Sequence, residues 1–301
     1  MKHITGYFME PQNFSVNDGN GIRTIIFFAG CPLSCRWCSN PEGYTASYKV
    51  AYYERTCIQC GRCTSSCPEG IGINLNEPER RLRCKACGAC TEVCPTKSRK
   101  SLVHCYSSRE LLKLIEKQKL FYRFSGGGVT FSGGEATMQA DILRELAFAL
   151  YDQGVDLAIE TSGYFYFDEV KDILQKMGLI FMDIKHMDDE KHRLHTGVSN
   201  KRILENIKRL GELEVPVVVR IPLIEGVNSD RENIRRTAAF VKASISYPKL
   251  ELLPYHLFGD SKYEALGMET PPREFSAPDR EYIEELAGVV KNAGVEVVSY
   301  K

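Results

Sequence analysis

Short apolar runs alternate with amphipathic stretches along most of the chain. Continuous runs of Val, Ile, Leu and Phe are typical of buried parallel strands. They predict six strands, at 23–28, 129–132, 156–160, 179–184, 216–221 and 250–253, and a last short one at 295–299. Helical periodicity between these runs predicts helices at 140–151, 168–177, 201–210 and 279–293.

Two capping boxes mark further helix starts. Ser107 with Glu110 is the first, because a Ser at the cap and a Glu three residues later satisfy each other's backbone N–H groups. The helix that it opens has an apolar face of Leu111, Leu112, Ile115 and Leu120. Ser229 with Glu232 predicts the start of another helix, which reaches about residue 243.

The order of elements predicts an α/β fold. Strands that each return through a helix form parallel βαβ units with right-handed crossovers. Eight such units would need more chain, so six units predict a partial (β/α)6 TIM-like barrel, with a doubly wound sheet as the alternative. Polar residues gather at the C-terminal end of each strand, which is the catalytic face of such a barrel.

The composition excludes several classes of protein. The chain has 301 residues, 43% hydrophobic, which suffices for a sizeable core. Lys plus Arg and Asp plus Glu are both 39, which argues against a protein that coats nucleic acid or an anionic membrane. We find no apolar run near the ~18 residues of a membrane span and no secretory signal at the N-terminus. We therefore expect a cytoplasmic protein with reduced thiols.

Cysteine is the unusual residue. Of twelve cysteines, all but Cys105 lie between residues 31 and 94, and such clustering in a reduced compartment indicates metal. Cys31, Cys35 and Cys38 form a C-x3-C-x2-C motif without a fourth ligand nearby. A structural zinc site needs four ligands, whereas an iron–sulfur cubane on three thiolates keeps one iron open. Zinc completed by a distant Cys or His is the alternative. Cys105 fits no motif, so we expect an ordinary small core residue.

A second cysteine pattern, C-x2-C-x2-C-x3-C-P, occurs twice in tandem. It is the run of bacterial two-cluster ferredoxins, in which the fourth Cys of each run ligates the other cluster. The expected ligand sets are Cys57, Cys60 and Cys63 with Cys94, and Cys84, Cys87 and Cys90 with Cys67. A pair of zinc knuckles is the alternative. We predict a ferredoxin-like insert at 46–104, held together by its clusters and close to the active face of a barrel formed by 1–45 and 105–301.

The first cysteine motif, with Trp37 before its last Cys, resembles the cluster motif of the radical S-adenosylmethionine (SAM) enzymes. Gly133-Gly134-Glu135 resembles the segment that holds the amino group of SAM. Further motifs resemble one branch, the glycyl radical enzyme activating enzymes: residues 18–24, with Asn20 where proline is usual, 183–185, 195–197, Arg220 and 253–256. One subgroup of these activating enzymes carries a ferredoxin-like insert, and this chain resembles that subgroup. The activator of pyruvate formate-lyase lacks such an insert.

The resemblance implies a mechanism. A 4Fe-4S cluster binds SAM through its open iron, and one electron cleaves SAM to methionine and a 5′-deoxyadenosyl radical, which takes an α-hydrogen from a glycine of a partner enzyme. The catalytic residues implied are Asp18, Lys185 and His256, with Asp18 near the partner's glycine loop. The SAM-binding residues implied are Trp37, Gly133, Gly134, Glu135, Asp183, Lys185, His195, Arg220 and His256.

The resemblance also implies cofactors and partners. The cofactors are SAM, three 4Fe-4S clusters (one that binds SAM and two auxiliary ones) and, in some relatives, a monovalent cation, here at Glu160, Thr161 and Asp183. The partners are a glycyl radical enzyme and a flavodoxin or ferredoxin that donates electrons, with no nucleic acid and no membrane, and we expect a monomer. The run C-x-W-C-S-N-P-E resembles activators of the hydroxyphenylacetate decarboxylase, choline lyase, isethionate lyase and arylalkyl-succinate synthase groups without choosing among them.

Alternative interpretations remain open at this stage. Glu135 can cap a helix, Asp183 with Lys185 and Arg220 with an acidic residue can be structural ion pairs, and His195 can be a solvated loop residue. The glycines at 126–128 do not form a nucleotide-binding fingerprint. A radical SAM enzyme for a small molecule, such as a heterocycle-forming synthase, and an electron-transfer protein are the alternative functions. The insert is an electron relay or a docking module, and the sequence does not decide which.

Overall fold

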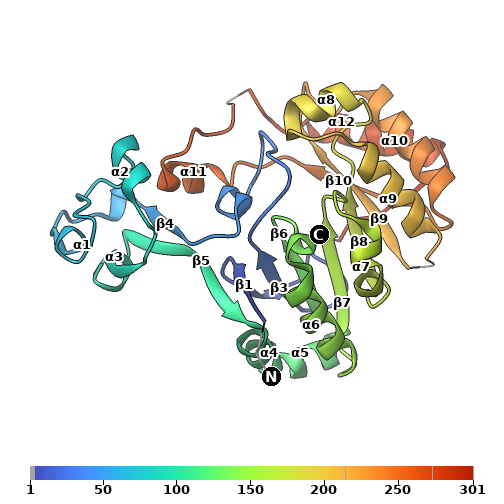
Figure 1. Ribbon diagram of the computed structural model, residues 1–301. Helices are drawn as coiled ribbons and strands as arrows, with labels where there is room; N and C mark the ends of the chain where they lie inside the picture. Colours follow the sequence, from blue (N-terminus) through green and yellow to red (C-terminus); the bar gives the residue numbers. More distant parts are fainter. Residues whose placement is uncertain (1–3, 214, 273, 301) are drawn as a thin grey trace.

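A computed structural model describes residues 4–213, 215–272 and 274–300, and these build one mixed sheet of eleven strands (Figure 1). The strand order is β11-β10-β9-β8-β7-β6-β3-β1-β5-β4, with β2 paired to β3. Neighbours from β3 to β11 pair in parallel. The six predicted strands and the short last one are confirmed as β3 (Arg23–Phe28), β6 (Gly128–Gly133), β7 (Asp156–Thr161), β8 (Leu179–Asp183), β9 (Val217–Leu223), β10 (Lys249–Pro254) and β11 (Glu296–Val297).

The remaining strands are antiparallel and were not predicted. They are β1 (Thr5–Phe8), β2 (Gln12–Ser15), β4 (Lys49–Tyr52) and β5 (Arg99–Ser107). Strand β5 pairs with β4 near its start and with β1 near its end, so it crosses the predicted boundary at residue 104. Its sequence, RKSLVHCYS, is polar at half its positions because part of the strand faces solvent. Cys105 lies on this strand and is exposed, so its predicted place in the core is wrong.

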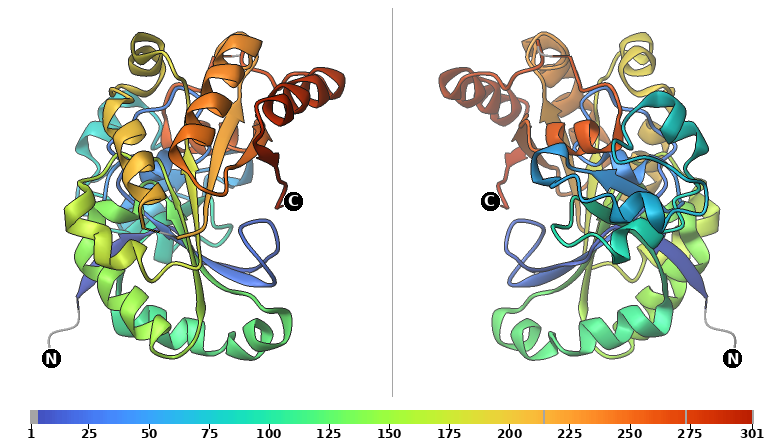
Figure 2. Two further views of the ribbon diagram at one scale, coloured as in Figure 1. Left: turned by 90° about the vertical axis from the view of Figure 1, so that its right-hand side faces the viewer. Right: turned by 90° about the vertical axis from the view of Figure 1, so that its left-hand side faces the viewer.

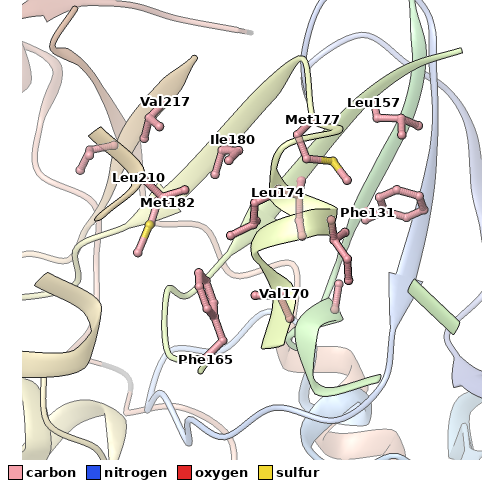
Figure 3. Close-up of a cluster of buried hydrophobic side chains, with 14 of the residues drawn as sticks. Phe131, Leu157, Phe165, Val170, Leu174, Met177, Ile180, Met182, Leu210 and Val217 are labelled. Atoms are coloured by element: carbon pink, nitrogen blue, oxygen red, sulfur yellow. The ribbon is translucent and has the colours of Figure 1, made fainter. Parts of the chain in front are cut away.

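Helices flank the strands at the predicted positions. They are α6 (Ala140–Tyr151), α7 (Phe167–Leu174), α9 (Lys201–Gly211), α10 (Arg231–Ser244) and α12 (Arg280–Asn292). Apolar side chains of α7, such as Val170 and Leu174, pack against Ile180 and Met182 of β8 (Figure 3). Helices α10 and α12 lie at the opposite end of the molecule from α4 and α5 (Figures 1 and 2). Within the described ranges, no helix is both long and apolar enough to cross a membrane.

One of the two capping boxes is confirmed. Ser107 caps α4 (Ser108–Glu116), with both reciprocal hydrogen bonds to Glu110. The helix stops at Glu116, and α5 (Lys119–Ser125) starts on a new phase, so Leu120 is 62% exposed and its predicted place on the core face is wrong. The cap of α10 is Asp230, which accepts a hydrogen bond from the Asn233 N–H at 2.9 Å, and not Ser229. Ser and Asp both cap helices well, so the sequence pattern alone did not distinguish Ser229 from its neighbour Asp230.

The β2–β3 hairpin packs directly on the backbone of the glycine run at 126–128. A Cβ atom at Gly127 would lie 1.9 Å from the carbonyl oxygen of Ile22, and one at Gly21 would lie 2.5 Å from the Gly127 nitrogen. Gly21 also has a φ of +67°, which glycine adopts without strain. Two backbone segments therefore touch without side chains between them, and this contact gives the glycine run a structural reason.

The cysteine-rich segment stands at one side of the molecule, away from α7 and α9 (Figure 1). Its helices are short: α1 (Arg62–Ser65), α2 (Pro78–Arg83) and α3 (Ala89–Glu92). Its buried apolar core is small, with Val50, Tyr52, Ile71 and Leu75. Two further helices outside it, α8 (Asp189–Thr196) and α11 (Asp260–Leu266), were not predicted.

Helix α11 holds the insert against the main sheet. Arg81 donates to the carbonyl of Ala265 at 2.5 Å, and the Asn76 side chain donates to the carbonyl of Glu264 at 2.7 Å. Both are carbonyls of the last helical turn, where few helical N–H groups remain to pair with them, so the two side chains of the insert add to the backbone cap that Gly267 gives α11.

We expect Gly127→Ala to lower stability by roughly 3 kcal/mol, because the new methyl group overlaps a carbonyl oxygen of the hairpin that cannot move alone. Gly288→Ala is the matched control. Gly288 lies in α12 with nothing within 4 Å of a new Cβ, so the control should stabilise the protein by roughly 0.5–1 kcal/mol. Anaerobic thermal unfolding measures both. Equal unfolding temperatures for the two variants would contradict the close contact between Gly127 and the β2–β3 hairpin.

Removal of iron should unfold the insert and leave the rest of the chain folded, since four buried apolar side chains are too small a core to hold the segment alone. Limited proteolysis of the chelated protein should cut between residues 54 and 98 and leave the parallel part of the sheet intact. Equal protection of this segment with and without iron would show that its core suffices.

Candidate active site

A cavity of ≈ 380 Å³ opens near the ends of six of the parallel strands, β3 and β6 to β10. Each of these strands, or the loop that follows it, contributes a lining residue: Cys31 in the loop after β3, Gly133 of β6, Glu160 of β7, Asp183 of β8, Arg220 of β9 and Pro254 of β10. The prediction that polar residues at the strand ends meet on one face is confirmed. Such a face is where α/β barrels and related parallel sheets bind substrates.

All three cysteines of the first motif line this cavity. Cys35 is buried, and Cys31 and Cys38 are half-buried. Their loop is fixed from outside by α8, because Ser34 and Arg36 donate backbone hydrogen bonds of 2.8 and 3.0 Å to the carbonyls of Thr196 and His195. Burial raises the pKa values of the Cys31 and Cys35 thiols to about 12. Thiolates form at such a place when a metal replaces the protons.

The donor set of this loop fits an iron–sulfur cluster. Soft sulfur ligands on a buried loop, beside an open cavity, match a cubane with one iron free for a further ligand. In the described residues no three His, Cys, Asp or Glu side chains surround one point closely enough to hold a single metal ion. The fit therefore rests on the type and burial of the donors.

Lys185 and Asp183 form an ion pair at the cavity wall, with Nζ and Oδ2 2.7 Å apart. Burial alone would lower the pKa of Lys185, but the negative charge of Asp183 outweighs it and raises this pKa. Lys185 therefore keeps its positive charge at neutral pH and cannot serve as a base. The alternative interpretation, in which Asp183 and Lys185 form an ion pair, is confirmed for their contact. The same two side chains also line the cavity in which a ligand would bind.

Arg220 lies between two carboxylates. Its Nε is 2.8 Å from Glu251, its Nη1 pairs with Glu160, and its Cζ lies 3.5 Å from the ring centroid of Phe181. Burial raises the pKa of Glu160, against the effect of Arg220, and Ser132 donates a hydrogen bond of 2.5 Å to the same carboxylate. The arginine is thus fixed by a buried ion-pair network, and one face of it lines the cavity.

Gly133 and Gly134 line the cavity, but the Glu135 side chain does not. Glu135 is fully buried, caps a short 3-10 helix at 136–139 and accepts hydrogen bonds from Thr161 and Ser162 at 2.5–2.9 Å. Its backbone N–H donates to the carbonyl of Gly30 at 2.7 Å, next to the cysteine loop. The structure therefore places Glu135 as a support for this loop, and a contact of Gly133, Gly134 and Glu135 with SAM remains a prediction.

Among the aromatic and histidine candidates, Trp37 and His256 line the cavity and His195 does not. Trp37 lines the cavity, with its ring centroid 5.7 Å from His195 and 6.0 Å from Phe275. His195 lies behind Trp37, outside the cavity lining, and burial together with Arg36 lowers its pKa, so it is neutral. His256 lines the cavity and stacks on Phe258 at 4.5 Å.

Asp18 also lines the cavity, from the β2–β3 hairpin. Its carbonyl accepts a hydrogen bond of 2.7 Å from the Thr130 hydroxyl, which accepts one of 2.7 Å from Arg23. Arg23 is 1% exposed and pairs with Asp156 at 2.7 Å. Sequence reasoning gave Arg23 no role, although an arginine at the start of an apolar strand is a signal for a buried, fully bonded guanidinium.

Tyr44 lines the cavity as well, and the sequence did not single it out. Its hydroxyl donates to the Cys35 carbonyl at 3.0 Å and meets the Tyr263 hydroxyl at 3.0 Å. It also lines a neighbouring cavity of ≈ 350 Å³ together with Cys84 of the insert. The cysteine loop and the insert are therefore neighbours through this tyrosine.

The insert holds two small cavities lined by cysteines. One, of ≈ 20 Å³, is lined by Cys57, Cys60, Cys63 and Cys94. The other, of ≈ 60 Å³, is lined by Cys63, Cys67, Cys84, Cys87 and Cys90. The structure thus brings together the four cysteines of each predicted ligand set.

Comparisons with known proteins agree with this site. The model of the Radical SAM superfamily matches residues 81–238, and that of the 4Fe-4S dicluster domain matches residues 49–95. The chain is 41% identical over 281 residues to the trans-4-hydroxy-L-proline dehydratase activating enzyme of Clostridioides difficile, covering 91% of this chain and 92% of that one. It is 38% identical over 268 residues to the choline trimethylamine-lyase activating enzyme of Oleidesulfovibrio alaskensis, covering 86% of both. It is 36% identical over 304 residues to the 4-hydroxyphenylacetate decarboxylase activating enzyme of Clostridioides difficile, covering 98% and 96%.

The matches define first a class, radical SAM enzymes that carry a dicluster domain. Within this class, the chain belongs to the family of glycyl radical enzyme activating enzymes. The predicted family is confirmed, and SAM with one 4Fe-4S cluster follows from it. A plain electron-transfer protein is excluded by the same matches.

Thr130→Val should loosen the hairpin that carries Asp18. The substitution keeps the shape of the side chain but removes the hydroxyl between Arg23 and the Asp18 carbonyl, at a cost of roughly 1–3 kcal/mol. Thr237→Val in α10 is the matched control, since its buried hydroxyl bonds only the Asn233 carbonyl. Hydrogen exchange should rise at residues 15–22 in the first variant alone. Unchanged exchange there would contradict this link.

Proposed function

We propose that this protein produces a radical on a glycine of a partner enzyme, using SAM and one electron. The observation that carries the proposal is a single cavity whose walls include both the three-cysteine loop and the hairpin with Asp18. When bound at a 4Fe-4S cluster, SAM supplies on reduction the 5′-deoxyadenosyl radical that takes the glycine α-hydrogen. A cavity shared by the two walls brings this radical and the glycine into reach and keeps water out.

The residues around the cavity have distinct roles in this proposal. Cys31, Cys35 and Cys38 hold the cluster. Gly133 and Gly134 offer bare backbone to the amino group of SAM. The positive charges of Lys185 and Arg220, held in place by their acidic partners, face its carboxylate.

Trp37 contributes an apolar wall, with His195 supporting it from behind. Asp18 and His256 line the same cavity, and in this proposal Asp18 helps to receive the partner's glycine loop.

The finer architecture belongs to the same proposal. The parallel strands run from β3 to β11 and stop at antiparallel neighbours on the β3 side, which supports an open, partial (β/α)6 barrel. Residues 46–104 form the ferredoxin-like insert. An open side gives a protein substrate access to a site that a closed barrel would hide.

The insert, in this proposal, carries two auxiliary 4Fe-4S clusters and passes electrons inward from a flavodoxin or ferredoxin. The cavity shared by Tyr44 and Cys84 supports this role, because it puts the second ligand set beside the SAM-binding loop. A monovalent cation remains a prediction, and its three candidate ligands, Glu160, Thr161 and Asp183, already bond other residues. The thiols needed for three clusters favour the reducing cytoplasm.

The partner in this proposal is a protein rather than a small molecule, because the relatives are named as activators of other enzymes. The relatives are named as activators of a dehydratase, a lyase and a decarboxylase. The chain itself, which we expect to be a monomer, does not choose among such partners.

The test is an anaerobic reaction of the reduced protein with SAM and the glycyl radical enzyme encoded beside it. We expect a doublet in the EPR spectrum, from one remaining α-hydrogen, and one methionine for each SAM cleaved. The signal should vanish when Cys31, Cys35 and Cys38 are replaced by Ala, because no cluster then binds SAM. Cys105→Ser, at an exposed cysteine outside the site, should keep the signal.

The outcomes separate the two remaining functions. If 5′-deoxyadenosine forms while no candidate partner gives a radical, the small-molecule alternative gains and the protein-glycine proposal fails. If Asp18→Asn keeps SAM cleavage but loses the doublet, the hairpin serves the partner and not SAM.

A further inference from the structure

The insert contains a buried positive charge that the proposed reaction does not use. Arg99, the first residue of β5, is 4% exposed. It lines both cysteine-lined cavities of the insert, and Cys63 is the other residue common to the two linings. The guanidinium thus lies between the places where the two auxiliary clusters fit.

Arg99 is held firmly and lacks a counter-ion in the described part of the chain. Its Nη2 donates to the carbonyls of Gly72 and Ile73 at 2.9 and 2.7 Å, and its Cζ lies 5.0 Å from the ring centroid of Tyr52. These contacts fix its position but neutralise nothing. Its Nε is buried and has no hydrogen-bond partner.

Burial of a guanidinium without a counter-ion costs free energy, and a neighbouring anion reduces this cost. A 4Fe-4S cluster on four thiolates is such an anion, and each one-electron reduction makes it more negative by one charge. Sulfur atoms of clusters accept hydrogen bonds, and both these bonds and nearby charges set the reduction potential. A buried cation favours the reduced state more than the oxidised one, so it raises the potential.

We propose that Arg99 is the shared counter-ion of the two auxiliary clusters. Its Nε–H donates to a sulfur atom at one cluster, and its charge raises the reduction potential of both. The low-dielectric position between the clusters makes this charge effective, whereas exposed arginines nearby are screened by water. The inference rests on the two clusters and not on the glycine chemistry, so it is tested without a partner enzyme.

The test is a redox titration followed by EPR, in full-length protein whose Cys31, Cys35 and Cys38 are Ala so that the auxiliary clusters alone titrate. Arg99→Gln should shift both midpoint potentials to lower values, because the charge is lost. The midpoint potentials of Arg99→Lys should lie between those of the parent and those of Arg99→Gln, because Lys keeps the positive charge but lacks the several N–H groups of the guanidinium. Arg62→Gln is the matched control. Arg62 lines the same cavity as Cys57 but is exposed, so its removal should shift the potentials less.

Iron content, measured first, separates tuning from folding. If Arg99→Gln and Arg99→Lys both load iron fully and titrate as the parent does, Arg99 is only a structural residue and the proposal is overturned. A shift confined to one cluster would overturn the shared role. If the Gln variant does not load iron, the Lys variant decides, and an unshifted titration there would likewise overturn the proposal.

Discussion

The structure depends on keeping sulfur ligands away from water and still compensating their charge. Burial alone would keep Cys31 and Cys35 protonated. The protein answers with a rigid loop and with fixed positive charge close by, of which Lys185 is the clearest case. Because Lys185 is paired to Asp183, it can face the cavity without being drawn away to solvent. The same solution recurs in the insert, where Arg99 stands between two cysteine-lined cavities. A buried charge is costly when alone, so each of these groups implies the ion that it accompanies.

Support for the site comes from segments far apart in the sequence. Glu135 holds Thr161 and Ser162 and, through its backbone, the strand end before Cys31. The hairpin with Asp18 rests on bare glycine backbone at 126–128 and is tied down by the hydrogen bonds of Thr130. The two supports act on two segments that line one cavity. A change in either would alter the distance between the walls, and the proposed hydrogen transfer depends on this distance more than on any acid or base.

The apolar runs and the cysteine spacings predicted most of this arrangement. Parallel strands are buried on both faces, so their sequences reveal them, and their ends locate the site without further knowledge. Strands β1, β2, β4 and β5 escaped because they are short or partly exposed and carry no such signal. The motif at 133–135 was found, but its Glu135 carboxylate points into the protein, since the partners that hold it come from β7, and no local pattern shows a contact over such a distance. Arg23 was missed for the same reason, because its partner Asp156 belongs to another strand.

Helix α11 connects the insert to the candidate site. Its last turn is capped by Asn76 and Arg81 of the insert. Its Tyr263 meets Tyr44, whose hydroxyl bonds the Cys35 carbonyl, and its Lys262 pairs with Glu42 at 2.6 Å. One short helix therefore touches both the cysteine-rich insert and the loop of Cys31, Cys35 and Cys38. Strand β5 adds a second connection, because it runs unbroken from the insert into the main sheet. Two connections of different kinds restrict hinge motion far more than one linker does, and a fixed separation between redox centres is what an electron relay requires and a mobile docking module does not.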